Sequence, residues 1–155
     1  MRQQSRKDHA CLMTTEDFIR ELCQRTGIEY AGVFGRGRKE GWLDAEDEVF
    51  KDKTITRKNV ARICHMYLLK VMNVADLDMS GAGKLKDLYD CRICANHIAQ
   101  VYLRGIMDAR NIKRDGEFLL FDLNGEDDEQ TNSAIIDRLL LIHVGDHVHQ
   151  DVTDS

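Results

Sequence analysis

The sequence predicts a mainly α-helical single domain built from helix–loop–helix units. Three observations predict this fold class. The chain of 155 residues contains no proline, so nothing of that kind interrupts a helix. Apolar residues recur at helical spacing in several stretches that glycines separate. Three of these stretches begin with a threonine four residues before an apolar pair. A hydrophobic content of 43% is enough for one core.

The first predicted helix follows a polar and basic leader, residues 1–12. Thr14 or Thr15 caps it, and Gly27 ends it. Its apolar stripe comprises Phe18, Ile19, Leu22 and Cys23. Residues 30–41 form either a short helix or a loop. The acidic stretch 44–52 is expected to be a solvated loop or one helical turn.

A second strong helix is predicted from Thr56 to about Met72, followed by a small, acidic and glycine-rich linker at residues 73–83. Residues 87–107 then read as a single amphipathic helix closed by Gly105. Its apolar stripe comprises Cys91, Cys94, Ala95, Ile98, Val101 and Tyr102.

The C-terminal part contains the one β-like segment, a short apolar run at 118–123 bounded by turn residues. An acidic loop at 126–129 leads to a last helix, for which Thr131 is the expected cap. We therefore expect one domain at residues 13–143 and a flexible tail at residues 144–155.

Charge and composition exclude several classes of protein. The net charge of −5 argues against a dedicated nucleic-acid binder, so no direct nucleic-acid partner is expected. No apolar run approaches the roughly 20 residues that a membrane span needs. The first residues do not have the apolar core of a secretory signal. The five cysteines, an odd number, favour reduced thiols and therefore a cytoplasmic location. A cell-surface location is the alternative if the chain is given without its signal.

The Thr-capped stretches indicate an internal repeat. Residues 13–19, 55–61 and 130–136 align, and each is followed one turn later by another buried-type residue. The repeating unit is a helix, a glycine turn, a loop and a Thr-capped helix, which is a spacing typical of repeat architectures.

This unit resembles the S-layer homology domain. The segments that carry the resemblance are Ile55–Lys58 (ITRK), Tyr102–Met107 (YLRGIM) and Asp115–Phe118 (DGEF). The resemblance covers about residues 13–143, as two units and one unpaired second helix. In that family the arginine of the Thr-Arg-Ala-Glu motif contacts anionic cell-wall polysaccharide, and here Arg57 alone matches it. Thr15 and Asn132 stand at the two equivalent positions, and Asn59 replaces the glutamate.

Four residues are candidates for binding. Arg57, together with Trp42, Arg36 and Arg38, could build a basic, aromatic-edged groove for an anionic glycan or an acidic partner. The competing interpretation is that Trp42 fills the core and that the arginines are solvated.

Cys91, Cys94 and His97 are the candidate metal ligands, because thiolate and imidazole are the side chains that zinc prefers. On a helix these three residues drift around the face, so Cys64 and His65 on the preceding helix could complete the set. The alternative, which the sequence favours, is that both thiols fill the core as small apolar groups.

No motif of an enzyme is present, so a non-enzymatic binding module is expected, with a protein or an anionic cell-wall glycan as partner. One alternative is a small acidic intracellular regulator or inhibitor that binds a basic surface of another protein. The other is a zinc-stabilised interaction domain. Nothing in the sequence fixes the oligomeric state.

Overall fold

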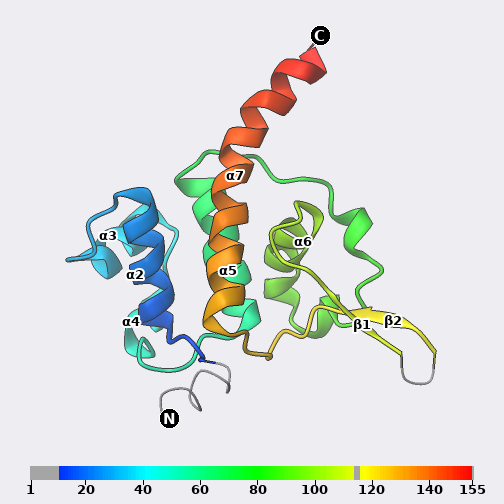
Figure 1. Cartoon of the computed structure of the whole chain (residues 1–155), viewed down its shortest axis with the longest axis horizontal. Helices are drawn as coiled ribbons and strands as arrows, with labels where there is room; N and C mark the ends of the chain where they lie inside the picture. The colour runs from blue at the N-terminus through cyan, green and yellow to red at the C-terminus, as the bar shows by residue number, and fades with distance from the viewer. Residues whose placement is uncertain (1–10, 114–115, 155) are drawn as a thin grey trace, which may run out of the picture.

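The computed structural model describes residues 11–113 and 116–154, and side chains beyond residue 142 lie outside that description. The chain is mainly helical, as predicted (Figure 1). Its α-helices are α2 (Thr15–Thr26), α3 (Val33–Glu40), α4 (Ala45–Val49), α5 (Arg57–Lys70), α6 (Ala95–Leu103) and α7 (Glu129–Asp154). The described residues also contain three short 3₁₀ helices: η1 (Met79–Ala82), η2 (Leu88–Asp90) and η3 (Arg92–Cys94).

The first helix, α2, begins and ends where the sequence predicts. The Thr14 hydroxyl accepts a hydrogen bond from the backbone of Asp17, and the Asp17 carboxylate accepts one from the backbone of Thr14. This reciprocal capping box satisfies two backbone donors that the first turn would otherwise leave unpaired. Gly27 ends the helix at a φ of 81°, a left-handed conformation that suits glycine.

The starts of α2, α5 and α7 are tied together at one end of the molecule (Figure 1). Single antiparallel bridges join Thr14 to Thr54 and Leu12 to Asp128. The backbone of Glu129 also donates to the carbonyl of Cys11 at 2.7 Å. Residues 11 and 12 therefore belong to the fold rather than to the predicted leader, of which residues 1–10 lie outside the described residues.

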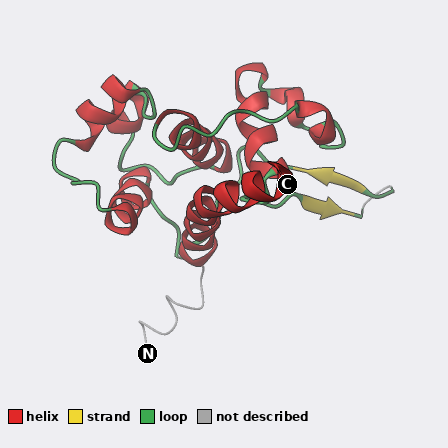
Figure 2. Cartoon of the chain, turned by 90° about the horizontal axis from the view of Figure 1, so that it is seen from above, coloured by secondary structure: helices red, strands yellow, loops and turns green. Residues whose placement is uncertain are grey.

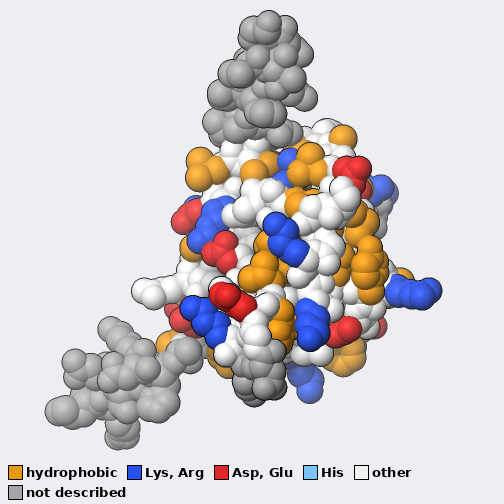
Figure 3. All heavy atoms as spheres, turned by 90° about the vertical axis from the view of Figure 1, so that its right-hand side faces the viewer, with side chains coloured by type: hydrophobic (Ala, Val, Ile, Leu, Met, Phe, Trp, Pro, Cys, Tyr) orange, Lys and Arg blue, Asp and Glu red, His pale blue; other side chains and the backbone are white. Residues whose placement is uncertain are grey.

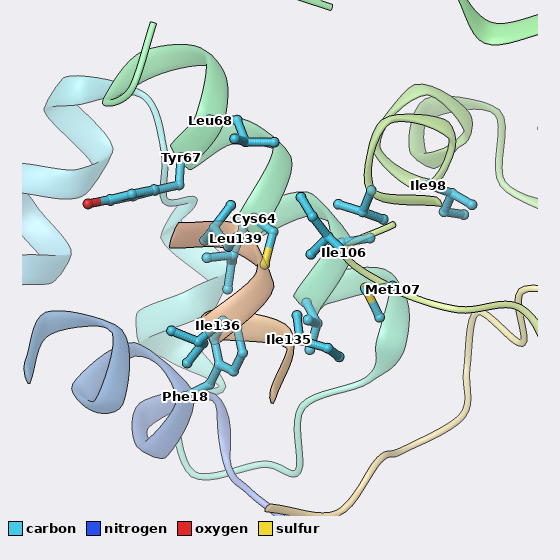
Figure 4. Close-up of a cluster of buried hydrophobic side chains, with 14 of the residues drawn as sticks. Phe18, Cys64, Tyr67, Leu68, Ile98, Ile106, Met107, Ile135, Ile136 and Leu139 are labelled. Carbon is cyan, nitrogen blue, oxygen red and sulfur yellow. The ribbon is translucent and has the colours of Figure 1, made fainter. Parts of the chain in front are cut away.

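The three aligned segments share one pattern of burial. The polar residue that follows each threonine is buried in every copy: Thr15, Arg57 and Asn132. The apolar pairs Phe18–Ile19, Val60–Ala61 and Ile135–Ile136 are fully covered, as are Leu22, Cys64 and Leu139 one turn later. The apolar residues of the three segments meet in one core, to which Ile98, Ile106 and Met107 also contribute (Figure 4).

Helix α7 begins earlier than expected. Thr131 is not its cap, because the Asp128 carboxylate accepts a hydrogen bond from the Thr131 backbone at 2.8 Å and the helix already starts at Glu129. The same hydrogen bond lowers the pKa of Asp128. The helix runs to Asp154, through residues that the sequence assigns to a flexible tail.

The prediction of one helix over residues 87–107 is wrong. Only Ala95–Leu103 forms an α-helix, and two 3₁₀ turns precede it. Cys91 breaks the helix with an extended conformation (φ −131°, ψ 106°). The Asp87 carboxylate accepts hydrogen bonds from the backbones of Phe121 and Asp122, at 2.8 and 2.7 Å, so this end of the segment is held by the loop after β2. The predicted stop at Gly105 does follow α6, at a φ of 74°.

The β-like run is present as half of a hairpin. Strand β2 (Phe118–Leu120) pairs antiparallel with β1 (Arg110–Ile112), which the sequence did not predict, and Leu119 lies opposite Asn111. Residues 114 and 115, between the two strands, lie outside the described residues, and with them Asp115 of the predicted DGEF segment. Seen from above, the hairpin projects from the helical body (Figure 2).

On the face that carries the hairpin, basic, acidic and apolar side chains are interspersed, and neither sign of charge dominates (Figure 3). Among the residues that the structure describes, no helix combines the length and the apolar character needed to cross a membrane.

Candidate functional site

Arg57 is the first residue of α5, and its guanidinium group is buried, with 4% of the residue exposed. Its Nη1 donates to Oδ2 of Asp127 at 2.6 Å. Its Nε and Nη2 donate to the backbone carbonyls of Phe121 and Asp108, at 2.8 and 2.5 Å. Three of the five N–H donors of Arg57 thus hold two loops, the one between α6 and β1 and the one between β2 and α7.

Asp127 joins Arg57 to a second arginine. Its other carboxylate oxygen accepts a hydrogen bond from Nη2 of Arg110 at 3.0 Å. Nε of Arg110, on strand β1, donates to Asp122 at 2.8 Å. Burial alone would lower the pKa of Arg110, but the hydrogen bonds to the two carboxylates outweigh it and raise that pKa. The result is a chain of alternating charges from the core to the surface.

The loop at residues 122–125 fixes one end of this chain. Asp122 adopts a φ of 68°, which is unusual for a residue with a side chain, and the Asp87 carboxylate holds its backbone N–H. Gly125 is required beside it, because a Cβ atom at this position would collide with the Asp122 carboxylate. The Gly125 carbonyl also accepts from the backbone of Arg57 at 2.8 Å, so loop and helix start are built together.

Arg57, Asp127 and Arg110 line a cavity of about 410 Å³ between the start of α5, the hairpin and α7. Arg57, Arg110 and Arg138 are its cations, and Asp108 and Asp127 are its carboxylates. Its remaining lining residues are Ala109, Gln130, Thr131, Ala134 and Ile135. Arg138, from α7, donates to the carbonyl of Ile106 at 3.2 Å and lies 3.8 Å from the Asp108 carboxylate.

The two outer arginines give the cavity its chemistry. The side chains of Arg110 and Arg138 are 41% and 42% exposed, whereas Arg57 is enclosed and committed to the fold. Guanidinium groups form paired hydrogen bonds with carboxylate and phosphate oxygens. Arg110 also binds Asp122, so the three arginines of this network meet three carboxylates, and any affinity of the cavity for a small anionic group rests on the half-exposed Arg110 and Arg138.

The structure separates Arg57 from the other predicted binding residues. Trp42 is buried in the core, where its ring lies edge-on to the Tyr67 ring with the two ring centroids 5.3 Å apart. Its indole N–H donates a hydrogen bond to the Glu40 carboxylate. Arg36 is exposed and donates to the carbonyls of Ala31 and Glu29, which closes its own loop. The prediction of a groove edged by Trp42 is therefore wrong, because Trp42 fills the core.

Arg38, the fourth predicted binding residue, also lies apart from Arg57. It belongs to α3, is exposed, and lies 3.9 Å from Glu48 of α4. It is not among the residues that line the cavity.

The predicted metal set is also not assembled. The sulfur atoms of Cys91 and Cys94 are bonded to each other, so the expectation of reduced thiols is wrong for this pair. His97 faces His65 rather than the two cysteines. The described residues contain no group of three or more histidine, cysteine or acidic side chains that could hold a metal ion. Cys64 is buried as a thiol, and burial raises its pKa to about 12.

His97 instead belongs to a polar cluster between α5 and α6. Its Nδ1 lies 2.8 Å from Nδ1 of His65, whose Nε2 lies 2.7 Å from the Asp76 carboxylate. Asn96 donates to the same carboxylate at 2.9 Å. Burial and the neighbouring His65 lower the pKa of His97 to about 4, so at neutral pH the His97 ring is uncharged.

Four charged residues of the cavity were not singled out from the sequence: Asp108, Arg110, Asp127 and Arg138. Asp127 lies in the acidic run at 126–129, which reads as solvated but supplies the buried partner of Arg57. Arg110 precedes an apolar run by several residues and could have been found only by predicting the hairpin. Arg138 lies on the polar side of the last helical stripe, where a charged residue carries no signal.

Fold and site together define a small helical domain with a buried arginine–aspartate network beneath an arginine-lined cavity. Comparison with protein-family models, with curated protein sequences and with solved structures found no match.

Proposed function

We propose that this protein is a non-enzymatic binding module that takes an anionic group, such as the acidic sugar of a cell-wall glycan, into the cavity lined by Arg57, Arg110 and Arg138. The observation that carries the proposal is the convergence of three arginines from three different elements on one cavity. The S-layer-homology resemblance of the ITRK segment points to the same cavity, because Arg57, which matches the arginine of that family's motif, lies in its lining.

The three arginines have different roles in this proposal. Arg57 holds the cavity floor through Asp127 and two backbone carbonyls. Arg110 and Arg138 are half exposed and contact the anion. The cavity volume of about 410 Å³ lies within the range common for small-ligand sites.

The acidic-regulator hypothesis has less support. It needs carboxylates free to meet a basic partner, but the acidic runs are partly used inside the fold. Asp47 is buried and binds Arg62 through both carboxylate oxygens, at 2.5 and 3.0 Å. Asp127 is likewise buried against Arg57.

The test is a sedimentation or calorimetric binding assay with purified anionic cell-wall polysaccharide. Arg138→Ala is the informative change, because Arg138 is half exposed and its loss leaves the Arg57–Asp127 pair intact. We expect binding to weaken roughly 10-fold, the loss of one charge-assisted contact, and Arg138→Lys to retain part of it. Arg38→Ala is the matched control, since Arg38 is an exposed arginine outside the cavity.

The glycan itself supplies a second control. Polysaccharide whose carboxyl groups have been reduced, or whose phosphates have been removed, should lose binding, and rising salt should weaken binding of the intact form. Equal binding of the parent protein and Arg138→Ala, or equal binding of the neutralised glycan, would contradict the proposal. Binding of an acidic protein but not of any glycan would redirect it to a protein partner.

A further inference from the structure

Cys91 and Cys94 form a disulfide that closes a loop within a single turn. The backbone of Cys94 already donates to the carbonyl of Cys91 at 3.1 Å, so the bond joins residues that the local fold holds together. A cross-link between residues three apart removes little freedom from the unfolded chain, in contrast to one that closes a long loop. The protein also has a large apolar core of its own. Stabilisation is therefore a weak explanation for this pair.

The two cysteines have different surroundings. Cys91 lines a cavity of about 300 Å³ together with Lys58, Asp90 and Asp122. Cys94 is not among the residues that line this cavity, and it directly precedes the first residue of α6. A thiol that enters this cavity meets Cys91 rather than Cys94, which makes Cys94 the sulfur that would leave.

The position of Cys94 favours it as the leaving group. It is the N-cap of α6, a helix of nine residues whose first backbone N–H groups and dipole carry positive charge. Thiolates are stabilised at helix N-termini and in Cys-x-x-Cys pairs, and a better-stabilised thiolate leaves faster in disulfide exchange. Cys23 and Cys64, in contrast, are buried in the core, and burial raises the pKa of each of these thiols.

From the disulfide, its cavity and its place before α6, we propose that Cys91–Cys94 is a thiol–disulfide exchange site that reacts with small thiols at Cys91. An external thiolate attacks the Cys91 sulfur, the bond to Cys94 breaks, and Cys94 leaves as a thiolate. A second external thiolate then attacks the mixed disulfide, which releases the Cys91 thiolate and a small disulfide that carries away the oxidising equivalents. The same small disulfide oxidises the pair in the reverse direction.

The cavity also predicts which thiols react best. Besides Cys91 it is lined by one ammonium group, on Lys58, and by three acidic residues, Asp87, Asp90 and Asp122, of which Asp87 is buried and Asp122 is paired with Arg110. This acidic lining attracts a cationic thiol and repels an anionic one. The thiol class that fits is therefore small and positively charged.

The experiment compares three thiols of the same skeleton: cysteamine, 2-mercaptoethanol and 3-mercaptopropionate. The folded protein is reduced under native conditions, and the rate of disulfide loss is followed by mass spectrometry of the Cys91–Cys94 peptide. Each rate is taken at equal thiolate concentration and divided by the rate for the isolated cyclic peptide of residues 91–94. We expect normalised rates that fall in the order cationic, neutral, anionic, with at least a fivefold span at low salt.

Trapping the intermediate identifies the attacked sulfur. When reduction by cysteamine is stopped early with acid, peptide mass spectrometry should find cysteamine attached to Cys91 and the free thiol at Cys94. Asp90→Asn, which neutralises one lining carboxylate, should narrow the span between cysteamine and 3-mercaptopropionate. The proposal is overturned if the folded protein reacts more slowly than the free peptide with all three thiols, if the charge order is flat or reversed, or if Cys94 is the sulfur modified first.

Discussion

The two segments that connect the Thr-capped helices differ in what they contribute. The first connector, residues 27–56 between α2 and α5, holds α3 and α4 and directs Trp42 and Leu43 into the core. The second connector, residues 71–128 between α5 and α7, is longer. It carries α6, the hairpin and the disulfide.

The difference separates stability from candidate function. The first connector is closed by apolar packing, and Gly37 is needed there because a Cβ atom would lie 2.7 Å from Cγ of Leu43. The second connector supplies the polar partners of Arg57 and, apart from Lys58 of α5, the residues that line the cysteine cavity. Similar helix starts thus support one connector that packs and another that presents chemical groups.

The largest expected effect is in the first connector. Trp42 is 1% exposed and contacts Tyr67, so Trp42→Ala leaves a large void and should lower the free energy of unfolding by about 4 kcal/mol. Urea unfolding measures this loss. Glycan affinity of the fraction that stays folded should equal that of the parent, and a loss of affinity there would show that the first connector also shapes the cavity.

The next effect tests the second connector. Arg57→Met leaves Asp127 buried without its main partner and should cost about 3 kcal/mol of stability. Removing both charges in Arg57→Met with Asp127→Leu should recover part of that loss, since no uncompensated charge stays buried. If the double variant loses as much unfolding free energy as the two single variants together, Arg57 and Asp127 are not energetically coupled.

A smaller effect should appear as pH falls. The pKa of His97 is about 4 in the folded protein and 6.5 in the unfolded chain, so the unfolded state binds the proton more readily between these values. Stability should therefore be full above pH 6.5 and should decline as pH falls towards 4, by on the order of 2 kcal/mol at pH 5. Chemical unfolding at several pH values measures the slope. His97→Gln should flatten this part of the profile, and an unchanged slope would place the titrating group elsewhere.

Local features of the chain were predictable, whereas contacts between distant segments were not. Thr14, Gly27 and the buried stripe of α2 follow from capping and helical spacing alone, and the burial of Thr15, Arg57 and Asn132 follows the predicted alignment. The break at Cys91 was missed because helical periodicity continues through it, while Asp87 is held by a loop more than 30 residues further on. Arg57 was found through its motif.

The partners of Arg57 could not be found in the same way. Arg110 reaches the cavity through a hairpin, and Arg138 reaches it through a helix that packs from the far end of the sequence. Neither position has a local signal, because each depends on how the second connector folds back over α5.

The bridges that tie residues 11–14 to residues 54 and 128 bear on the order in which the protein can fold during synthesis. The first helix is made early, but one of its neighbours in the core, Ile136, belongs to the last helix. Until that helix has left the ribosome, the apolar faces of α2 and α5 lack a cover. Because a nascent chain grows by about 5–20 residues per second, this exposed interval lasts several seconds, during which aggregation or chaperone binding competes with closure.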